Sequence, residues 1–316
     1  MNTHASATII PRQPQRRFVR TSAPRLEIVI PVKNAAQALR TAVESVHRRL
    51  ASEFDLPFRV TIADNASTDN TAEIARSLAR ELPSVRHLRV EREGRGRALR
   101  AAWTESDADV VACIDVEFSA DGGRLPELLA PLLAGHADIV IGSRLVPGAH
   151  LARARKREAI ARGYCGLLGM LLGAAFSDPR CGFKAARREV VQALLPLVED
   201  EGGFFDTEFL YLAQRNAYSI REVPVDWVDD ADWRACTPRS AIDDLKGIAR
   251  LRRRTREGRD RLVERTGAAP AAGTSEAARL RFRGPGNRRR GASRLTSPDS
   301  CGTRRPGSQP TAGALP

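Results

Sequence analysis

The sequence predicts an α/β fold: a mostly parallel, twisted sheet with helices on both faces. Two observations favour this class. Apolar, β-branched runs alternate with amphipathic segments over the first 150 residues, as expected for parallel strands joined by crossover helices. Polar and charged residues also follow the ends of these runs. Because ligands of such sheets bind beyond the carboxyl ends of the strands, the second pattern predicts where a site would lie.

The hydrophobic periodicity gives the expected elements in order. The expected strands of the first half cover residues 26–32, 58–63, 85–90, 110–115 and 137–141. The expected helices between them cover residues 35–50, 71–82, 97–106 and 125–133. After residue 150 the pattern predicts a basic helical segment at 151–162, an apolar stretch at 164–176, helices near 188–195 and 208–216, a strand at 220–227 and a closing helix at 241–253.

The net charge of +13 is concentrated in the two flanks of the chain. Residues 1–25 hold five Arg and no acidic residue, and residues 251–316 hold sixteen Arg and five acidic residues. Few large apolar side chains accompany these charges, so we expect 1–25 and 254–316 to be disordered. A single domain is expected over 26–253. The basic flanks are either solvated tails or contacts for anionic lipid or nucleic acid.

Cysteine spacing and hydropathy bear on location. The five cysteines are scattered without a C-x-x-C spacing, which disfavours disulfides and a zinc site and fits a reducing cytosol. No apolar run approaches the roughly 20 residues of a spanning helix, and residues 1–25 lack the apolar core of a secretory signal. We expect a cytoplasmic protein, open to peripheral contact with the inner membrane face. The stretch 164–176 is either a core helix or an interfacial one.

A pair of acidic residues ends the apolar run at 110–115. Asp115 and Glu117 are two positions apart, so in an extended chain they point to the same side. Two carboxylates together with diphosphate oxygens suit Mg²⁺ or Mn²⁺, which prefer hard oxygen ligands. The alternative is an acidic strand end that faces solvent.

Other polar groups follow other predicted strand ends. Asp64 follows the second strand, Arg95 the third and Arg144 the fifth. The topology therefore predicts that these side chains meet Asp115 and Glu117 at one edge of the sheet.

Eight short motifs occur in a fixed order along residues 26–253. They are PVKN (31–34), ADNASTDNT (63–71), GRGRAL (94–99), DVE (115–117), IGSR (141–144), CGFKA (181–185), FFDTE (204–208) and EVPVDW (222–227). Together they resemble family 2 glycosyltransferases of the polyprenyl-phosphate sugar synthase type, such as the dolichyl-phosphate mannose and glucose synthases. The resemblance implies a GT-A fold, a nucleotide-binding α/β sandwich.

The resemblance also implies a set of donor-site residues. Asp64 would accept a hydrogen bond from the base, and Asp115 with Glu117 would hold the metal that bridges the diphosphate. Arg95 and Arg97 would offer forked donors to phosphate, unless they belong to an exposed basic turn. The implied nucleotide-sugar residues are Pro31, Asn34, Asp64, Asn65, Arg95, Arg97, Asp115 and Arg234.

The acceptor implied by the resemblance is a polyprenyl phosphate, which is already ionised and needs positioning more than deprotonation. The cations implied for it are Arg144, Arg162 and Lys184, together with the 153–157 cluster. Asp206 of the FFDTE motif would orient the donor sugar, or it caps the helix that begins near Thr207. The residues expected to act in catalysis are Asp115, Glu117, Asp206 and Arg144.

The chain departs from the family pattern at several positions. Lys33 and Ala35 replace the usual Tyr and Glu, Glu117 replaces Asp, and Arg180 replaces Gln. Trp233 stands where a Ser is usual, next to Arg234.

The sequence supports three hypotheses. The first is a metal-dependent, inverting transfer of mannose or glucose from a nucleoside-diphosphate sugar to a polyprenyl phosphate. The second, raised by the departures, is a catalytically weak homologue that binds nucleotide sugar or lipid phosphate without turnover. The third is nucleic-acid binding through the tails, which ranks last because no aromatic stacking platform accompanies the arginines.

Overall fold

The computed structural model describes residues 25–116, 124–149, 151–152, 155–225, 227–228 and 238–262. Side chains are described for all of these except 151–152, 155–157, 227–228 and 238–239. Glu117, Trp233 and Arg234 lie outside the described residues, as do Arg153 and most of both flanks. What the sequence predicts of these residues therefore stays a prediction.

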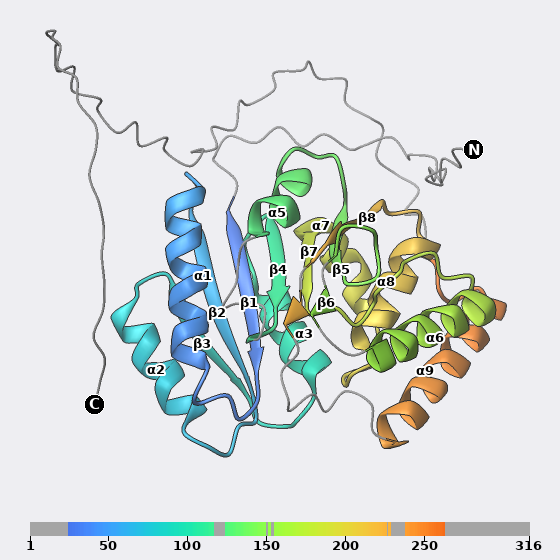
Figure 1. The fold of residues 1–316 in the computed structure, drawn as a ribbon, viewed down its shortest axis with the longest axis horizontal. Coiled ribbons are helices and arrows are strands. Elements are labelled where there is room, and N and C mark those ends of the chain that lie inside the picture. Colours follow the sequence, from blue (N-terminus) through green and yellow to red (C-terminus); the bar gives the residue numbers. More distant parts are fainter. Residues whose placement is uncertain are drawn as a thin grey trace, which may run out of the picture. The chain divides into compact units, whose positions relative to one another are not determined.

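A seven-stranded sheet in the order β3-β2-β1-β4-β7-β5-β8 forms the centre of the fold (Figure 1). Its strands are β1 (Leu26–Val32), β2 (Phe58–Asn65), β3 (Val85–Val90), β4 (Val110–Ile114), β5 (Ile139–Ser143), β7 (Phe183–Arg187) and β8 (Ile220–Pro224). The pairs are parallel except that β7 runs antiparallel to both β4 and β5. A separate parallel pair joins β6 (Leu151–Ala152) to β9 (Trp227–Val228). The predicted α/β class with a mostly parallel sheet is confirmed.

Helices cover both faces of the sheet. One face carries α1 (Leu39–Glu53), α2 (Thr71–Glu81) and α5 (Leu125–Leu133), which share a core cluster with Ile28 and Ile30 of β1. The other face carries α3 (Arg95–Glu105), α6 (Arg155–Leu172), α7 (Arg188–Leu194), α8 (Phe205–Arg215) and α9 (Pro238–Arg256), which pack with Val29. Successive residues of a strand point to opposite faces, so one β-branched strand serves both cores.

Several element bounds differ from the predicted ones. The first helix begins at Leu39 instead of residue 35, because Asn34 has a left-handed φ of 52° and the chain turns before the helix starts. The predicted segments 151–162 and 164–176 merge into α6, which is continuous over 155–172. Strand β7 was not predicted, because FKAAR is short and carries two cations.

The folded part extends past the predicted boundary at residue 253. Arg254 is buried on α9, and the fully buried Asp260 accepts a hydrogen bond of 2.6 Å from Arg215 of α8. At the other end, Arg25 forms an ion pair of 2.6 Å with Asp107. The described structure therefore includes residues that composition alone assigned to disordered flanks.

Two helical glycines allow a test of this packing. A Cβ atom at Gly247 of α9 would lie 2.4 Å from the Phe204 ring, whereas one at Gly163 of α6 would meet nothing within 4 Å. We expect Gly247→Ala to lower the free energy of unfolding by about 1–3 kcal/mol, despite the better helix propensity of Ala. We expect Gly163→Ala to raise it by about 0.5–1 kcal/mol. Chemical denaturation measures both, and equal effects of the two substitutions would contradict the packing of α9.

Candidate functional site

The pairing of residues between neighbouring strands shows which predicted site residues lie at the same edge of the sheet. Val29 of β1 pairs with Cys113 of β4, Cys113 pairs with Lys184 of β7, and Lys184 pairs with Ile141 of β5. Asp115 lies two residues beyond this row. Because β7 is antiparallel, its amino end reaches the same edge that the other strands reach with their carboxyl ends.

Asp64 lies at this edge two strands away from Asp115. Asp64 pairs with Val32 near the end of β1, one residue beyond the level of Pro31. Neighbouring strands are about 4.8 Å apart, so the backbones at Asp64 and Asp115 are separated by roughly 10 Å across the sheet. Both acids therefore lie at the same edge of the sheet, called the rim below. Asp64 is in register with Val32 of the core beside α1 and α2, whereas Asp115 continues the row of Cys113 in the core beside α3 and α8.

A chain of opposite charges joins α3, α8, β7 and the residue after β4 at the centre of the rim. Arg95, the first residue of α3, forms an ion pair of 2.7 Å with Asp115 and a second one with Asp206 of α8. Lys184, which is buried, lies 3.2 Å from the other oxygen of Asp206. Burial opposes the charge of Arg95, but the two carboxylates outweigh it and hold its pKa well above the ordinary value.

Gly182 lies directly against the Asp115 carboxylate. Its carbonyl accepts a hydrogen bond of 2.9 Å from the Asp115 amide. A Cβ atom at position 182 would lie 1.9 Å from Oδ2 of Asp115 and 2.2 Å from its Cγ. The glycine of the CGFKA motif is therefore required for the Asp115 side chain to lie where it does, a role that sequence reasoning missed.

The chemistry of the rim suits a divalent cation only in part. In the described portion of the chain, no group of three or more His, Cys, Asp or Glu side chains is arranged to hold a metal ion. Asp115 would supply one hard oxygen ligand to such an ion, and Glu117 lies outside the described residues. Mg²⁺ is commonly bound by one or two carboxylates plus substrate phosphates, so this donor set fits an ion that arrives with a diphosphate.

Asp64 is fully buried, and both of its oxygens accept hydrogen bonds. Oδ1 accepts from the Ser67 amide at 2.9 Å, and Oδ2 accepts from Arg89 of β3 at 2.6 Å. Burial raises the pKa of Asp64, but the hydrogen bonds from Ser67 and Arg89 outweigh it and hold the pKa below the ordinary value. Sequence reasoning missed Arg89, which the β2–β3 register places directly beside Asp64.

Asn34 and Asn65, two of the residues predicted to bind the nucleotide sugar, form hydrogen bonds with backbone amides of the loops at this edge. Oδ1 of Asn34 accepts a hydrogen bond of 2.8 Å from the Thr68 amide, which joins the loops after β1 and β2. Oδ1 of Asn65 accepts one of 2.7 Å from the Gly94 amide, directly before α3. Both amide oxygens thus have backbone partners, and Asn65 fixes the approach to Arg95.

Arg97 lies outside the charge chain of Arg95. Its guanidinium pairs with Glu201, and its amide donates to the Glu201 carbonyl at 3.0 Å. The Gly96 amide likewise donates to the Gly202 carbonyl at 3.2 Å. The first amides of α3 are therefore capped by the 201–202 segment of the same chain. Lys33, one of the departures, forms an ion pair of 2.5 Å with Glu93.

The three cations predicted for the acceptor have separate anionic partners. Arg144 donates to Asp178 through Nε at 2.7 Å and through NH2 at 2.9 Å. Arg162 pairs with Glu158, one turn earlier on α6, at 2.8 Å. Lys184 belongs to the Asp206 side of the charge chain. Lys184 thus lies at the centre of the rim and Arg144 follows the end of β5, whereas the side chain of Arg162 is exposed on α6.

Arg180 is accommodated by partners from two helices. It donates to Asp244 of α9 at 2.9 Å and lies 5.6 Å from the centre of the Tyr164 ring of α6. The Tyr164 hydroxyl is 3.1 Å from that of Thr207, the neighbour of Asp206. Burial raises the pKa of Asp244 in spite of the charge of Arg180. The positive charge of Arg180, which replaces the Gln usual in the family, is therefore paired with Asp244 on α9.

Comparison with solved structures identifies the class of fold. The crystal structure of glucosyl-3-phosphoglycerate synthase from Mycobacterium tuberculosis with Mn²⁺ and UDP-glucose superposes with a TM-score of 0.52. It is 20% identical in sequence, and the match covers 75% of this chain and 79% of that protein. The fold is thus that of the GT-A glycosyltransferases.

Sequence comparison gives the family. Residues 27–195 match the model of glycosyl transferase family 2, and the chain belongs to that family. Glycosyltransferase AglD of Haloferax volcanii is 36% identical over 70% of this chain, although the chain spans only 36% of AglD. An undecaprenyl-phosphate mannosyltransferase of Micrococcus luteus is 32% identical over 65% of this chain and 84% of its own length. The family named from the motifs is confirmed.

The close contact between Gly182 and Asp115 gives a testable prediction. We expect Gly182→Ala to push the carboxylate aside and to weaken Mn²⁺-dependent binding of UDP or GDP by up to about 10²-fold, as a misplaced catalytic group would. Calorimetric titration measures the affinity, and Gly166→Ala, which meets nothing within 4 Å on α6, is the control. Unchanged nucleotide affinity in a folded Gly182→Ala protein would exclude Asp115 from the site.

Proposed function

We propose that the protein transfers a hexose, mannose or glucose, from a nucleoside-diphosphate sugar to a polyprenyl phosphate, with Mg²⁺ or Mn²⁺ as cofactor. Family membership and the name of the Micrococcus luteus relative support this proposal. The observation that carries it is the chain of charges from Asp115 through Arg95 and Asp206 to Lys184 at the carboxyl edge of the sheet.

In the proposed reaction an oxygen of the acceptor phosphate attacks C1 of the hexose, and the nucleoside diphosphate leaves with the electron pair of the broken bond. A single displacement inverts the configuration at C1. The acceptor is already an anion, so it needs shielding from the diphosphate more than a strong base. Arg144 and Lys184 are the cations proposed to supply that shielding.

The metal would neutralise charge that develops on the departing diphosphate. Asp115 is the described residue proposed to hold it, with Glu117 as the second ligand. Arg95 is proposed to donate to the diphosphate from the side of its guanidinium that lies near Asp115, while Asp206 pairs with the other side.

The base of the nucleotide is proposed to bind beside Asp64. A carboxylate accepts hydrogen bonds only, so it selects a base edge that presents an N–H group. Arg89 keeps Asp64 ionised and limits the directions from which the base can approach. Pro31, Asn34 and Asn65 are proposed to shape the same end of the site, and Arg234 is proposed to reach the diphosphate.

A weak or inactive homologue is the alternative, and one observation favours it. Asp115 and Asp206 are already compensated by Arg95 and Lys184, so the charge balance of the rim does not demand a metal. Replacing Glu117 by Asp separates the two hypotheses. Activity that appears or rises sharply with Asp identifies Glu117 as a handicap, and an unchanged low activity means that the metal site is unused.

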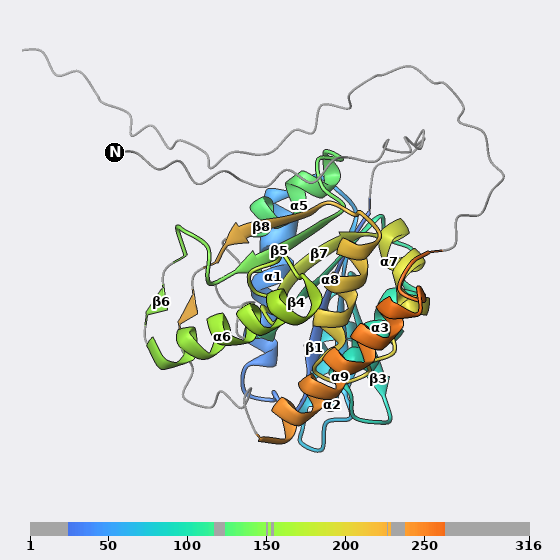
Figure 2. The same cartoon turned by 90° about the vertical axis from the view of Figure 1, so that its right-hand side faces the viewer.

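We further propose that α6 and α9 contact the membrane. Among the residues whose side chains the structure describes, the large apolar ones that are exposed all lie on these helices: Ile160 (40%), Met170 (76%), Ile242 (53%) and Leu245 (54%). The two helices lie side by side (Figure 2). Exposed Lys246, Arg252 and Arg253 follow the apolar residues on α9, which suits anionic headgroups. No helix in the described ranges meets the length and hydropathy of a bilayer span.

The transfer itself is tested with purified protein, undecaprenyl phosphate, Mn²⁺ and labelled GDP-mannose or UDP-glucose. We expect a lipid-linked hexose with one donor, and its loss when the metal is chelated. Asp206→Asn is expected to lower the rate on the order of 10²-fold, whereas Asp55→Asn on the exposed surface leaves it unchanged. No product with either donor would overturn the proposed function.

Vesicle sedimentation tests the membrane face. We expect the protein to bind vesicles that contain phosphatidylglycerol, and the double variant Ile242→Ser, Leu245→Ser to bind at least about tenfold more weakly, because two apolar side chains no longer leave water. Ala51→Ser on the exposed side of α1 serves as the control. Equal binding of the double variant and the control would remove α9 from the contact.

A further inference from the structure

We propose that Arg250 of the closing helix α9, supported by Arg254, is a positioning residue for the donor site. This inference rests on the proposed function and deepens it. It gives a role to the closing helix, which extends to Arg256 and so includes Arg254 of the segment that was expected to be disordered. The argument follows contacts from α9 through a short loop to the first turn of α3.

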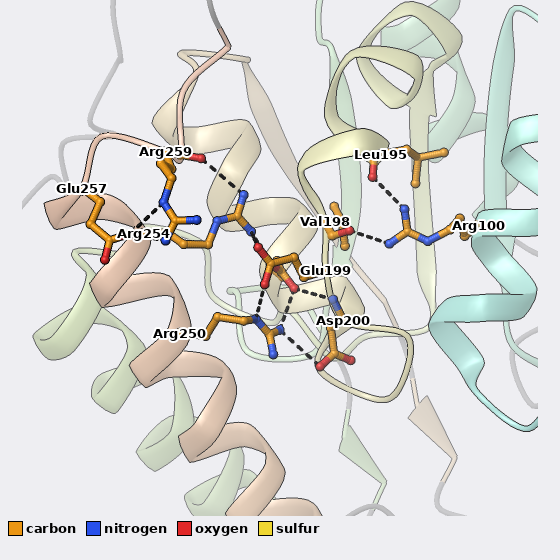
Figure 3. Close-up of polar contacts among 10 residues, drawn as sticks. Arg100, Leu195, Val198, Glu199, Asp200, Arg250, Arg254, Glu257 and Arg259 are labelled. Atoms are coloured by element: carbon orange, nitrogen blue, oxygen red, sulfur yellow. Dashed lines mark hydrogen bonds and ion pairs between the residues drawn. The ribbon is translucent and has the colours of Figure 1, made fainter.

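The first step is a buried cluster of charges behind the rim. Arg250 and Arg254 extend from α9 toward the segment that carries Glu199 and Asp200 (Figure 3). Glu208 of α8, which is fully buried, accepts from Arg250 at 2.8 Å and from Arg254 at 3.0 Å. A buried carboxylate of this kind is tolerated only with such partners.

The second step is the loop before α8. Arg250 also lies 3.3 Å from Asp200, and the Asp200 amide donates to Glu208 at 2.8 Å. Asp200 in turn accepts from the Gly202 amide at 2.8 Å. Arg100 of α3 holds the preceding turn by donating to the Leu195 and Val198 carbonyls (Figure 3). The loop therefore has its conformation fixed from the α9 side and from the α3 side.

The third step is the cap on α3. The Glu201 and Gly202 carbonyls accept from the first amides of the helix, those of Arg97 and Gly96. The approach is so close that a Cβ atom at Gly94 would lie 2.5 Å from the Glu201 oxygen. The capped turn begins with Arg95, which holds Asp115 and Asp206. Displacing the loop would therefore move the guanidinium that joins the two carboxylates.

The same cluster also reaches Asp206 directly through α8. Glu208 is two residues after Asp206, within the first turn of that helix. Arg250 and Arg254 thus fix the end of α8 that carries Asp206 as well as the loop that caps α3. The cluster is therefore connected to Arg95 through the loop that caps α3, and to Asp206 through the first turn of α8.

The chain offers a matched control at the opposite end of α8. Arg215 pairs with fully buried Asp260 at 2.6 Å, as Arg250 pairs with fully buried Glu208 at 2.8 Å. The two arginines have similar side-chain exposure, 30% and 24%. Both pairs join α8 to α9 or to the residues just after it, but only the pair of Arg250 contacts the 199–202 segment.

The test compares Arg250→Met with Arg215→Met, each checked for folding by thermal unfolding. We expect Arg250→Met to speed hydrogen exchange at the Gly96 and Arg97 amides and to weaken Mn²⁺-dependent UDP or GDP binding by about tenfold. Arg250→Lys, which keeps the charge, is expected to restore part of both. Arg215→Met is expected to lower the melting temperature to a similar degree. It is expected to change neither the hydrogen exchange at Gly96 and Arg97 nor the nucleotide affinity.

Equal changes in the two Met variants would overturn the positioning role, as would unchanged exchange at Gly96 and Arg97 in Arg250→Met. If Arg250→Met does not fold, the comparison of Arg250→Lys with Arg215→Lys decides in the same way. The exchange measurement needs no nucleotide. A wild-type protein that binds neither nucleotide therefore counts against the proposed function, while the exchange result still decides the role of Arg250.

Discussion

The site depends on one guanidinium that pairs with two carboxylates from distant parts of the chain. Arg95 at the start of α3 holds Asp115 after β4 and Asp206 on α8, and all three are at least partly removed from water. Leaving any one of these charges buried and unpaired costs several kcal/mol, on the order of 3–5. The position of each of the three elements is therefore tied to the other two.

This interaction explains features that are puzzling in isolation. Gly182 has no side chain because Asp115 lies against it, and Gly94 and Gly96 have none because the 201–205 segment lies against the start of α3. The antiparallel direction of β7 brings Gly182 and Lys184 to an edge otherwise formed by carboxyl ends of strands. The three glycines and the antiparallel strand β7 thus allow Asp115, Arg95, Asp206 and Lys184 to come together.

The same arrangement sets the terms on which ligands would bind. In the proposed reaction Asp115 would help to hold the metal, and Arg95 would offer its guanidinium to the diphosphate while Asp206 stays paired with it. A cation at Asp115 and an anion at Arg95 would keep both partly buried charges compensated. Arg250 and Arg254 are proposed to fix the loop and the helix end that position Arg95 and Asp206.

The sequence by itself determined the α/β class, the order of most elements and the polar residues near the strand ends, because hydrophobic periodicity and residue type are local properties of the chain. It also named the family through its ordered motifs. The tertiary structure alone decided that β7 is antiparallel, that Arg89 lies beside Asp64, that Asp178 pairs with Arg144 and that Arg250 and Arg254 of α9 are largely removed from water. Each of these depends on pairing between residues far apart in sequence, and neither periodicity nor composition records which remote partner a charge will have.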